Sequence, residues 1–561
     1  MTWEPILPVR MRRGSLTVMA SQAQDEPWLC PEGTAARMRG LYLTDYGWKN
    51  RSEPWPKLPF LLHDVVTAVG TGRDPDDVLA EILAANAEPP IHPGVARYLK
   101  YALATYVETD AMLAEGTPGL RHTPAREALF DADTVKAFAI YLDDGAGLRE
   151  VRRLRQVHTR EPDDNTLAWA GVAAYTLVHG TRFYPGEDPP PTRIRILEVG
   201  LTLEDDVTVL LDGTPADASR LYNDHAEARL FRLATGITRR VGARCSNCYY
   251  IGGCDTLPRA NGVLGMPNNG VCTRNVSAST LTAYRWCPAQ HFLRDLAFLP
   301  RDRNVEVDTR EQQRGTAVHQ WLEVAHRRSV GCTAEDLPVP SAAAAAVDEG
   351  PLGLGPLTPE NYALAWPLLR KHVATCALTY DHVDAPIEVE TLRRYFDAEA
   401  DVIVVAKPDL SFVAGGRPVW RETKTTGKPP PTNASDVVAT SLAAALYLTL
   451  LADGVPSGDG QTPGVLEWEV LSTTDDEPHL YYLDTDDEQL VAIARHRVAE
   501  TALAWHSDTI FPADPHPWKC DRCSVARWCP SAGASPLPGA SMAPGVDPTD
   551  IEDVDNEPPP F

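Results

Sequence analysis

Long apolar segments are missing from this 561-residue chain, and their absence excludes a membrane-spanning protein. No stretch approaches the roughly 18 consecutive apolar residues that a spanning helix needs. The N-terminal segment MTWEPILPVRMRRG also lacks the apolar core of a secretory signal peptide. We therefore expect a cytoplasmic protein without a membrane partner.

Lysine is scarce. Nine of the 52 basic residues are lysines, against 77 acidic residues, and the net charge is −25. Such an excess of acid excludes a protein that binds nucleic acid over its whole surface. A basic channel in one enzyme cleft stays compatible with the composition, because net charge says little about a single cleft. A lysine within a motif is correspondingly informative.

A nucleotide-binding P-loop is missing as well. The segment TTGKPP does not follow the pattern G-x4-G-K-[ST]. We therefore predict no ATPase or helicase in this chain, so a DNA-unwinding motor would be a separate partner.

Cysteine is present in a regular pattern. Eleven cysteines in a cytoplasmic chain are more typical of metal binding or reactive chemistry than of disulfides. Six of them form two triplets with the same C-x2-C-x5-C spacing, and a lone Cys-Pro cysteine stands upstream of each triplet. The two sets are Cys30, Cys245, Cys248 and Cys254, then Cys287, Cys520, Cys523 and Cys529.

The two cysteine sets belong to a wider internal repeat. The triplets lie 275 residues apart, the segments LREVRRL and WRETKTT lie 272 apart, and the lone cysteines lie 257 apart, all in the same order. Chain length and this repeat predict tandem domains over residues 1–270 and 271–535. Residues 536–561 are rich in proline and acid, which predicts a disordered tail.

The C-terminal half has a readable order of helices and strands. Apolar periodicity predicts helices over residues 313–327, 437–452 and 487–505. Runs of β-branched and aromatic residues predict strands over residues 389–396, 400–413, 419–424, 465–473 and 480–485. This order indicates an α/β domain with a small mixed sheet.

One predicted strand brings an acid and a base together. Glu422 and Lys424 are two residues apart, so their side chains share one face of the strand. Asp409 precedes them in the predicted hairpin, and His319 lies on the helix before it. Two carboxylates and an imidazole suit Mg²⁺ or Mn²⁺, with the lysine placed to orient a water. A surface salt bridge is the alternative interpretation of the Glu-x-Lys pair.

The ordered set Gly315-x3-His319, Lys407-Pro408-Asp409, Glu422-Thr423-Lys424 and helical Tyr447 resembles the PD-(D/E)XK nuclease superfamily, in its RecB-like branch. The cysteine pattern resembles the iron–sulfur members of that branch, namely CRISPR-associated RecB-type exonucleases and end-resection nucleases. Two positions depart from the family pattern. Ala443 stands where the family has a glutamine before the tyrosine, and Ala406-Lys407-Pro408 lacks the usual glycine.

The resemblance implies two tandem restriction-endonuclease-like domains and a deoxyribonuclease acting on single-stranded DNA or DNA ends. Its divalent metal would be held by His319, Asp409 and Glu422, with Lys424 and Tyr447 as the other catalytic residues. DNA repair or antiviral defence is the implied setting, with a helicase, another ATPase or a defence protein as partner.

The resemblance also implies a [4Fe–4S] cluster on Cys287, Cys520, Cys523 and Cys529, which would join the two ends of the C-terminal domain. Zinc is the alternative, because four thiolates also bind Zn²⁺. The N-terminal set of four cysteines is predicted to hold a second metal or cluster.

The N-terminal half is predicted to be a degenerate copy. Arg152 stands at the lysine position beside Glu150, and arginine cannot serve as a base because its pKa exceeds about 12. The residue that corresponds to Asp409 is Asp143 or Asp144, and His63 aligns weakly with His319. A non-catalytic DNA-binding or scaffold subunit is the alternative function for the whole chain.

Overall fold

The structure is a computed structural model, and it describes most of the chain. The described residues are 9–11, 16–43, 55–86, 88–130, 133–182, 188–268, 273–302, 310–340, 357–379, 383–384, 387–457, 462–532 and 551–552. Most of the acidic C-terminal segment, for which we predicted disorder, lies outside this described part.

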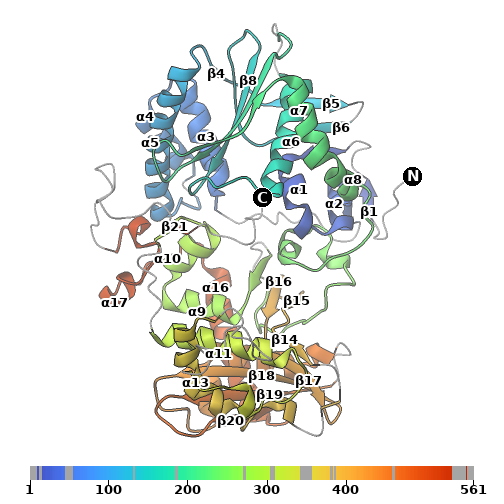
Figure 1. Cartoon of the computed structure of the whole chain (residues 1–561), viewed down its shortest axis with the longest axis vertical. Coiled ribbons are helices and arrows are strands. Elements are labelled where there is room, and N and C mark those ends of the chain that lie inside the picture. The colour runs from blue at the N-terminus through green and yellow to red at the C-terminus, as the bar shows by residue number, and fades with distance from the viewer. Residues whose placement is uncertain are drawn as a thin grey trace.

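The molecule is elongated, with the two halves of the chain stacked along its long axis (Figure 1). The N-terminal half fills the upper part of that view and the sheet of the C-terminal half fills the lower part. Each half contains a five-stranded mixed sheet with helices packed against it. The predicted mixed α/β fold is therefore confirmed.

The C-terminal sheet has the strand order β14-β17-β18-β19-β20. Strands β18 and β19 run parallel, and every other neighbouring pair is antiparallel. The five strands are β14 (Glu388–Val389), β17 (Leu410–Ala414), β18 (Arg417–Thr426), β19 (Val465–Ser472) and β20 (His479–Asp484). Pairing of β18 with β17 ends at Arg421, whereas pairing with β19 continues to Thr426, so the C-terminal end of β18 extends beyond β17.

Helices α11 (Arg310–His326), α13 (Pro359–His372) and α16 (Glu488–Ser507) flank this sheet. The predictions of helices near residues 313–327 and 487–505 are confirmed. The N-terminus of α16 is capped by Asp487, whose side chain accepts hydrogen bonds from two backbone amides.

The single helix predicted over residues 437–452 is wrong. The structure has α14 (Ala434–Thr440) and α15 (Leu442–Ala452), which meet at an angle of 110°. Ser441 between them has an extended backbone, and its hydroxyl accepts a hydrogen bond from the amide of Ala444, so it caps the second helix. Helix α15 is buried almost all round, because β19 covers one side of it and helices α16 and α9 (Ala278–Trp286) pack on it as well.

A second, smaller sheet crosses the C-terminal half. It consists of β12 (Arg274–Val276), β16 (Val402–Ala406) and β15 (Arg393–Asp397), in that order. The segment 400–413, predicted as strand, therefore divides between two sheets at residues 407–409. Asp409 lies in this connection, directly before β17.

The N-terminal half repeats this strand pattern. Its five-stranded sheet has the order β11-β10-β8-β7-β4, in which β8 and β10 are the parallel pair. The strands are β4 (Arg121–Thr123), β7 (Ile140–Asp143), β8 (Leu148–Arg155), β10 (Arg193–Gly200) and β11 (Val207–Gly213). A smaller sheet pairs β2 (Thr17–Met19) with β6 (Asp133–Lys136), followed by β5 (Arg126–Phe130) and β9 (Thr181–Arg182).

The helices of this half lie on both sides of its main sheet (Figure 1). They are α1 (Ala20–Asp25), α2 (Pro31–Met38), α3 (Leu58–Gly70), α4 (Pro75–Ala85), α5 (Pro93–Gly116), α6 (Asp164–His179), α7 (Pro215–Tyr222) and α8 (Ala228–Ala234).

The two halves exchange packing segments. Trp528, close to the C-terminal cysteines, packs edge-on against Tyr98 of α5 at a centroid distance of 5.0 Å. In the opposite direction, Ile251 beside the N-terminal triplet shares a core with Phe396 and Ile403 of the small C-terminal sheet. Each cysteine triplet thus lies where one half meets the other.

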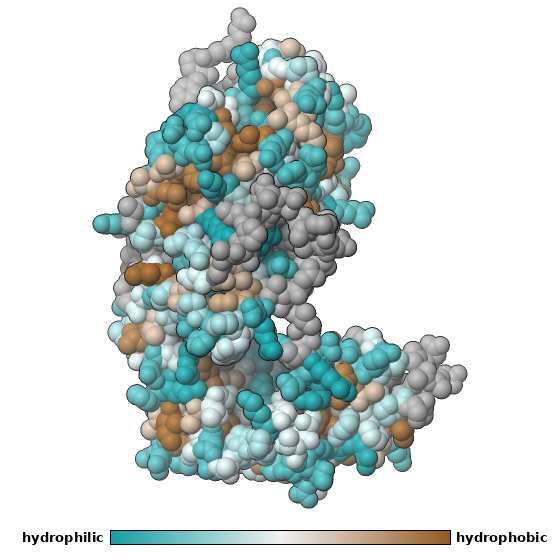
Figure 2. Space-filling view, turned by 90° about the vertical axis from the view of Figure 1, so that its left-hand side faces the viewer, coloured by the Kyte–Doolittle hydropathy of each residue, from teal (hydrophilic) through white to brown (hydrophobic). Residues whose placement is uncertain are grey.

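Within the described residues, no single helix is long and apolar enough to cross a membrane. The bent pair α14 and α15 passes that test only when both helices are taken together. Figure 2 shows a mostly hydrophilic surface and an outline notched on one side, above the projecting C-terminal sheet region.

Candidate metal-dependent active site

Strand β18 carries Glu422 and Lys424 on one face. The Lys424 Nζ lies 2.5 Å from Glu422 Oε1. Glu422 is buried, while the lysine side chain stays partly exposed at the end of the strand. Strand β19 pairs with β18 at both residues, whereas pairing with β17 ends at Arg421, so Glu422 and Lys424 lie just beyond β17 on that side.

Asp409 reaches this pair from the connection before β17. Its Oδ2 accepts a hydrogen bond from the backbone amide of Thr423 at 2.6 Å. This bond fixes one carboxylate oxygen between Glu422 and Lys424, and it leaves Oδ1 to face the neighbouring helix.

Helix α11 supplies His319, whose Nδ1 lies 3.1 Å from Asp409 Oδ1. Gly315, one turn earlier, lets the helix approach β18 closely. A Cβ at that position would lie 3.0 Å from Thr425 Oγ1, which is tighter than ordinary side-chain packing. The Gly-x3-His pattern thus has a steric cause: the glycine is where helix and strand touch.

Glu390 is a further acid of this cluster that the sequence did not indicate. Its Oε1 lies 4.0 Å from His319 Nδ1, and its Oε2 forms an ion pair with Lys407 Nζ at 2.7 Å. His319, Glu390 and Asp409 bring donor atoms within 4.8 Å of one another. Glu390 has a positive φ of 52° after the short strand β14, and no motif spacing predicts such a turn.

The two carboxylates Glu422 and Asp409 differ in their titration. Burial, followed by the charge of Asp409, raises the pKa of Glu422 to about 7, and Lys424 offsets part of this rise. The Oε2 atom of Glu422 is buried without a hydrogen-bond partner in the described structure. A buried carboxylate oxygen of this kind is costly unless a cation binds it.

The remaining charges compensate one another. Burial disfavours the charged form of His319, but its hydrogen bond to Asp409 gives a net rise in the pKa of the imidazole. The pKa of Asp409 is lowered, because His319 and Lys424 outweigh burial. The pKa of Lys424 is raised by Glu422 and Asp409 against burial, so the lysine is charged near neutral pH.

Tyr447 of α15 supports the loop rather than the carboxylates. Its hydroxyl accepts a hydrogen bond from the backbone amide of Lys407 at 3.3 Å, and its ring packs edge-on against Trp420. Burial raises its pKa well above the usual value. The structure thus brings His319, Asp409, Glu422 and Lys424 together and places Tyr447 behind them.

The corresponding place in the N-terminal half is filled by arginine. Glu150 is held by Arg152 at 2.6 Å and by Arg195 at 3.0 Å, and Asp143 is paired with Arg126 at 3.2 Å. Guanidinium groups occupy the carboxylate oxygens that a metal would need.

The other two candidates of this half have local roles. Asp144 accepts bonds from the backbone amides of the β7–β8 turn, at Ala146 and Leu148. His63 contacts the carbonyl of Ala139 and stacks on Phe138.

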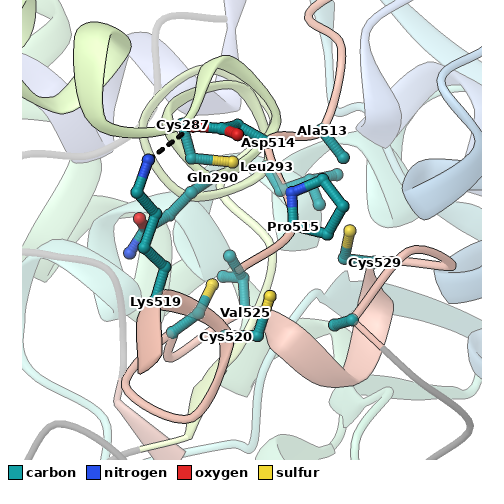
Figure 3. A pocket seen from close by; sticks show the side chains of 12 residues that line it. Cys287, Gln290, Leu293, Ala513, Asp514, Pro515, Lys519, Cys520, Val525 and Cys529 are labelled. Carbon is teal, nitrogen blue, oxygen red and sulfur yellow. Dashed lines mark hydrogen bonds and ion pairs between the residues drawn. The ribbon is translucent and has the colours of Figure 1, made fainter. Parts of the chain in front are cut away.

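The C-terminal cysteines Cys287, Cys520, Cys523 and Cys529 line one pocket together with apolar residues (Figure 3). Cys287 comes from the start of α10 (Pro288–His291), and the other three come from the segment around α17 (Pro517–Cys520). Burial, and then the nearby thiols, raises the pKa of Cys523 to about 12. A thiolate there therefore requires a compensating positive charge, which a bound metal supplies.

The N-terminal cysteines gather in the same way. A Cβ on Gly33 would lie 3.6 Å from Cys30 Sγ and 3.7 Å from Cys248 Sγ, so both sulfurs lie next to Gly33. Burial, then the neighbouring thiols, raises the pKa of Cys248 to about 12. Backbone amides point at three sulfurs of this set, donating from Arg240 to Cys30, from Gly242 to Cys245 and from Tyr250 to Cys248.

The spacing of the sulfurs bears on what they hold. Among the described residues, neither cysteine set brings three donor atoms within 4.8 Å of one another. A single tetrahedral Zn²⁺ with 2.3 Å bonds would draw its sulfurs to about 3.8 Å from each other. The sulfurs of neither set are therefore drawn together as closely as around one such ion.

Comparison with known proteins agrees with this geometry. Residues 275–530 match the family model of the PD-(D/E)XK nuclease superfamily. The C-terminal part of the chain therefore carries a nuclease-type fold of that superfamily, which is consistent with a divalent metal. Among solved structures, one titled "Crystal structure of SSO0001" is 13% identical and covers 39% of this chain and 97% of its own, at a TM-score of 0.18. No curated protein matches.

Proposed function

We propose that the chain is a divalent-metal-dependent deoxyribonuclease whose chemistry lies in the C-terminal half. The observation that carries this proposal is the partly buried pair of Asp409 and His319 beside Glu422 and Lys424, with one buried Glu422 oxygen left without a partner in the described structure. Its substrate would be DNA, as single strands or at ends.

The residues divide the work by their charges. His319, Glu390 and Asp409 bring their donor atoms within 4.8 Å of one another, which suits Mg²⁺ or Mn²⁺, and Glu422 on β18 would be a further ligand. When bound, the ion supplies Lewis-acid stabilisation of the charge that develops on the phosphate oxygens. Lys424, charged and held by Glu422, orients the attacking water. Tyr447 positions the loop that carries Asp409.

We further propose that the chain arose by tandem duplication, with residues 1–270 as the inactive copy and 271–535 as the active one. The shared strand order of the two five-stranded sheets supports this, as does the equivalent placement of Glu150 and Glu422 on β8 and β18. The arginines around Glu150 support loss of metal binding in the first copy. That copy would then serve to hold nucleic acid.

Each cysteine set is proposed to hold a [4Fe–4S] cluster with a structural role. Burial of the thiols and the spacing of their sulfurs support a cluster over zinc. The Cys523→Ser variant should lose iron and the visible absorption of the cluster, measured in anaerobically purified protein. Zinc in place of iron in the wild-type protein would contradict this proposal.

The nuclease proposal is tested by digestion of end-labelled single- and double-stranded DNA with Mn²⁺ or Mg²⁺. Lys424→Ala should lower the cleavage rate about 100-fold or more, since it removes the charge beside the reacting phosphate. Lys428→Ala is the matched control, because Lys428 is exposed just beyond the same strand.

The outcomes separate the alternatives. Loss in Lys424→Ala with wild-type rates in Lys428→Ala supports the site. Equal rates in all three proteins contradict it. No cleavage by folded, metal-loaded wild type, with DNA binding retained, supports the non-catalytic scaffold function, unless a helicase, another ATPase or a defence-system partner restores cleavage.

A further inference from the structure

A second cluster of metal-binding side chains lies behind the sheet, outside the groups described above. It consists of His326, Cys332, His372 and Cys376, whose donor atoms all lie within 4.8 Å of one another. All four are buried, with exposed fractions of 2% or less. The sequence presents them as two short pairs, His-x5-Cys and His-x3-Cys, each at the end of a helix.

The distances fit one tetrahedral ion. His326 Nε2 lies 3.1 Å from His372 Nε2 and 3.8 Å from Cys376 Sγ. Bonds of 2.0–2.1 Å to nitrogen and 2.3 Å to sulfur would separate two nitrogens by about 3.3 Å and a nitrogen from a sulfur by about 3.6 Å. This cluster is therefore compact enough for a single ion, in contrast to the four-cysteine sets.

A buried carboxylate orients one ligand. His372 Nδ1 lies 2.8 Å from Glu469 Oε2 on β19, so the ring proton is on Nδ1 and Nε2 turns toward the cluster. Glu469 also accepts hydrogen bonds from the hydroxyls of Thr423 and Thr375. A carboxylate behind a histidine is the usual outer shell of a protein metal site.

The position of the cluster suggests what the ion would do. His326 is the last residue of α11 and His372 the last residue of α13, where helix dipoles favour a positive charge. His326 is seven residues from His319, which is roughly 10 Å along the same helix. An ion here would therefore fix the helix that carries a catalytic histidine.

We propose that His326, Cys332, His372 and Cys376 bind one structural Zn²⁺ ion. Two imidazoles and two thiolates form a closed donor set with no position for substrate, which is the character of a structural zinc site. Through Glu469 and Thr423 the site is also joined to the strand between Glu422 and Lys424. The zinc proposal itself does not depend on nuclease activity.

The test is metal analysis of the full-length protein. Wild type is analysed as purified without added zinc, and again after incubation with Zn²⁺ and gel filtration. Each preparation should carry one zinc ion per chain. Cys376→Ser should lose this zinc while its iron content stays unchanged. His496→Gln, at an exposed histidine of α16, is the matched control and should keep this zinc. Cys332→His replaces the thiolate with an imidazole nitrogen that can also bind zinc, so it should keep the ion, which separates loss of a ligand from loss of the fold.

A second readout identifies the ligands. Co²⁺ in place of zinc should give the visible absorption of a tetrahedral, thiolate-ligated ion, and Cys376→Ser should remove it. Three results would overturn the proposal: no zinc in either wild-type preparation, zinc retained in Cys376→Ser, or a Cys332–Cys376 disulfide in zinc-free protein. A His326–His372 hydrogen bond would then explain the short distance between the rings.

Discussion

At the scale of single residues, Asp409 and Glu422 of the candidate centre have pKa values shifted in opposite directions. Asp409 is held charged by His319, whereas burial raises the pKa of Glu422 to about 7. A site that binds a divalent cation lowers such a raised pKa, because the charged carboxylate gains a partner. Glu422 therefore gains a charged partner when an ion binds.

Glu422→Gln should weaken Mn²⁺ binding at this centre by 10-fold or more, as estimated for loss of a charged ligand contact worth roughly 1.5–3 kcal/mol. Isothermal titration of the full chain with Mn²⁺ measures this directly. Glu477→Gln, at an exposed acid outside the cluster, serves as the control. Unchanged affinity in Glu422→Gln would show that the ion binds elsewhere.

His506 is a fully buried histidine near the end of α16. Burial, and then the Arg274 guanidinium, lowers its pKa to about 4. The unfolded chain takes up this proton near pH 6.5 and the folded chain only near pH 4. The stability that neutral His506 provides is therefore present above pH 6.5 and lost as the pH falls toward 4.

Between pH 7 and pH 5 this one group should lower the free energy of unfolding by about 2 kcal/mol, at 1.36 kcal/mol per pKa unit. Urea unfolding at the two pH values measures the difference. In His506→Gln the difference should shrink by that amount, whatever the variant does to overall stability. An unchanged pH slope would contradict a lowered pKa.

At the scale of helices and strands, the site depends on close contact between α11 and β18. Gly315→Ala would place a Cβ 3.0 Å from Thr425 Oγ1. Alanine favours a helix interior over glycine by roughly 1 kcal/mol. This gain offsets the cost of the close contact, so the free energy of unfolding should change little. The helix must shift by a few tenths of an ångström, which moves His319 and should lower the cleavage rate about 10-fold.

Gly116→Ala is the matched control, since a Cβ there meets nothing within 4 Å. The double variant Gly315→Ala/Thr425→Ala should recover part of the rate by making room. Melting temperatures and cleavage rates of the four proteins distinguish a steric effect from general destabilisation. Full activity in Gly315→Ala would contradict the steric role of this glycine.

Elements with strong local signals follow from the sequence, and those that depend on distant partners do not. Helix α16 has a capping aspartate and a clear apolar face, and β18 and β19 are rich in β-branched and aromatic residues. The break at Ser441 carries no glycine or proline, so periodicity alone extends one helix through it. Strand β12 joins β16 from more than 120 residues away, which no local pattern indicates.

The candidate site divides in the same way. Asp409, Glu422 and Lys424 lie within 16 residues of one another on adjoining elements, so their meeting could be predicted from strand geometry. Glu390 approaches through a positive-φ turn, and His372 reaches His326 only because α13 packs on α11. Tertiary packing, rather than spacing along the chain, creates these two contacts.

At the scale of the whole molecule, the halves are joined through their cysteine segments. Tyr98 of α5 packs on Trp528, whose indole N–H donates to the carbonyl of Pro300 at 2.7 Å. We expect the C-terminal cysteine segment to be stabilised by a residue of the other half.

Tyr98→Ala should increase hydrogen exchange in residues 517–532, although the substitution lies more than 400 residues away in sequence. Removing a buried aromatic ring costs about 3–5 kcal/mol, and part of that loss falls on the packed partner. Tyr175→Ala is the control, because Tyr175 packs against Tyr222, with the two rings tilted, within the N-terminal half. Equal exchange of residues 517–532 in wild type and Tyr98→Ala would show that the halves are uncoupled.

The central claim is that one half holds the nuclease centre and the other does not. The most direct test compares Asp409→Asn with Asp144→Asn, one of the two acids at the aspartate position in the N-terminal half, in Mn²⁺-dependent cleavage of end-labelled DNA. Asparagine preserves the shape of both side chains and removes the charge.

We predict a loss of about 100-fold or more in Asp409→Asn and a rate within about twofold of wild type in Asp144→Asn, since only the first carboxylate lies in a metal-binding group. Cleavage that survives Asp409→Asn, or disappears in Asp144→Asn, would contradict the claim.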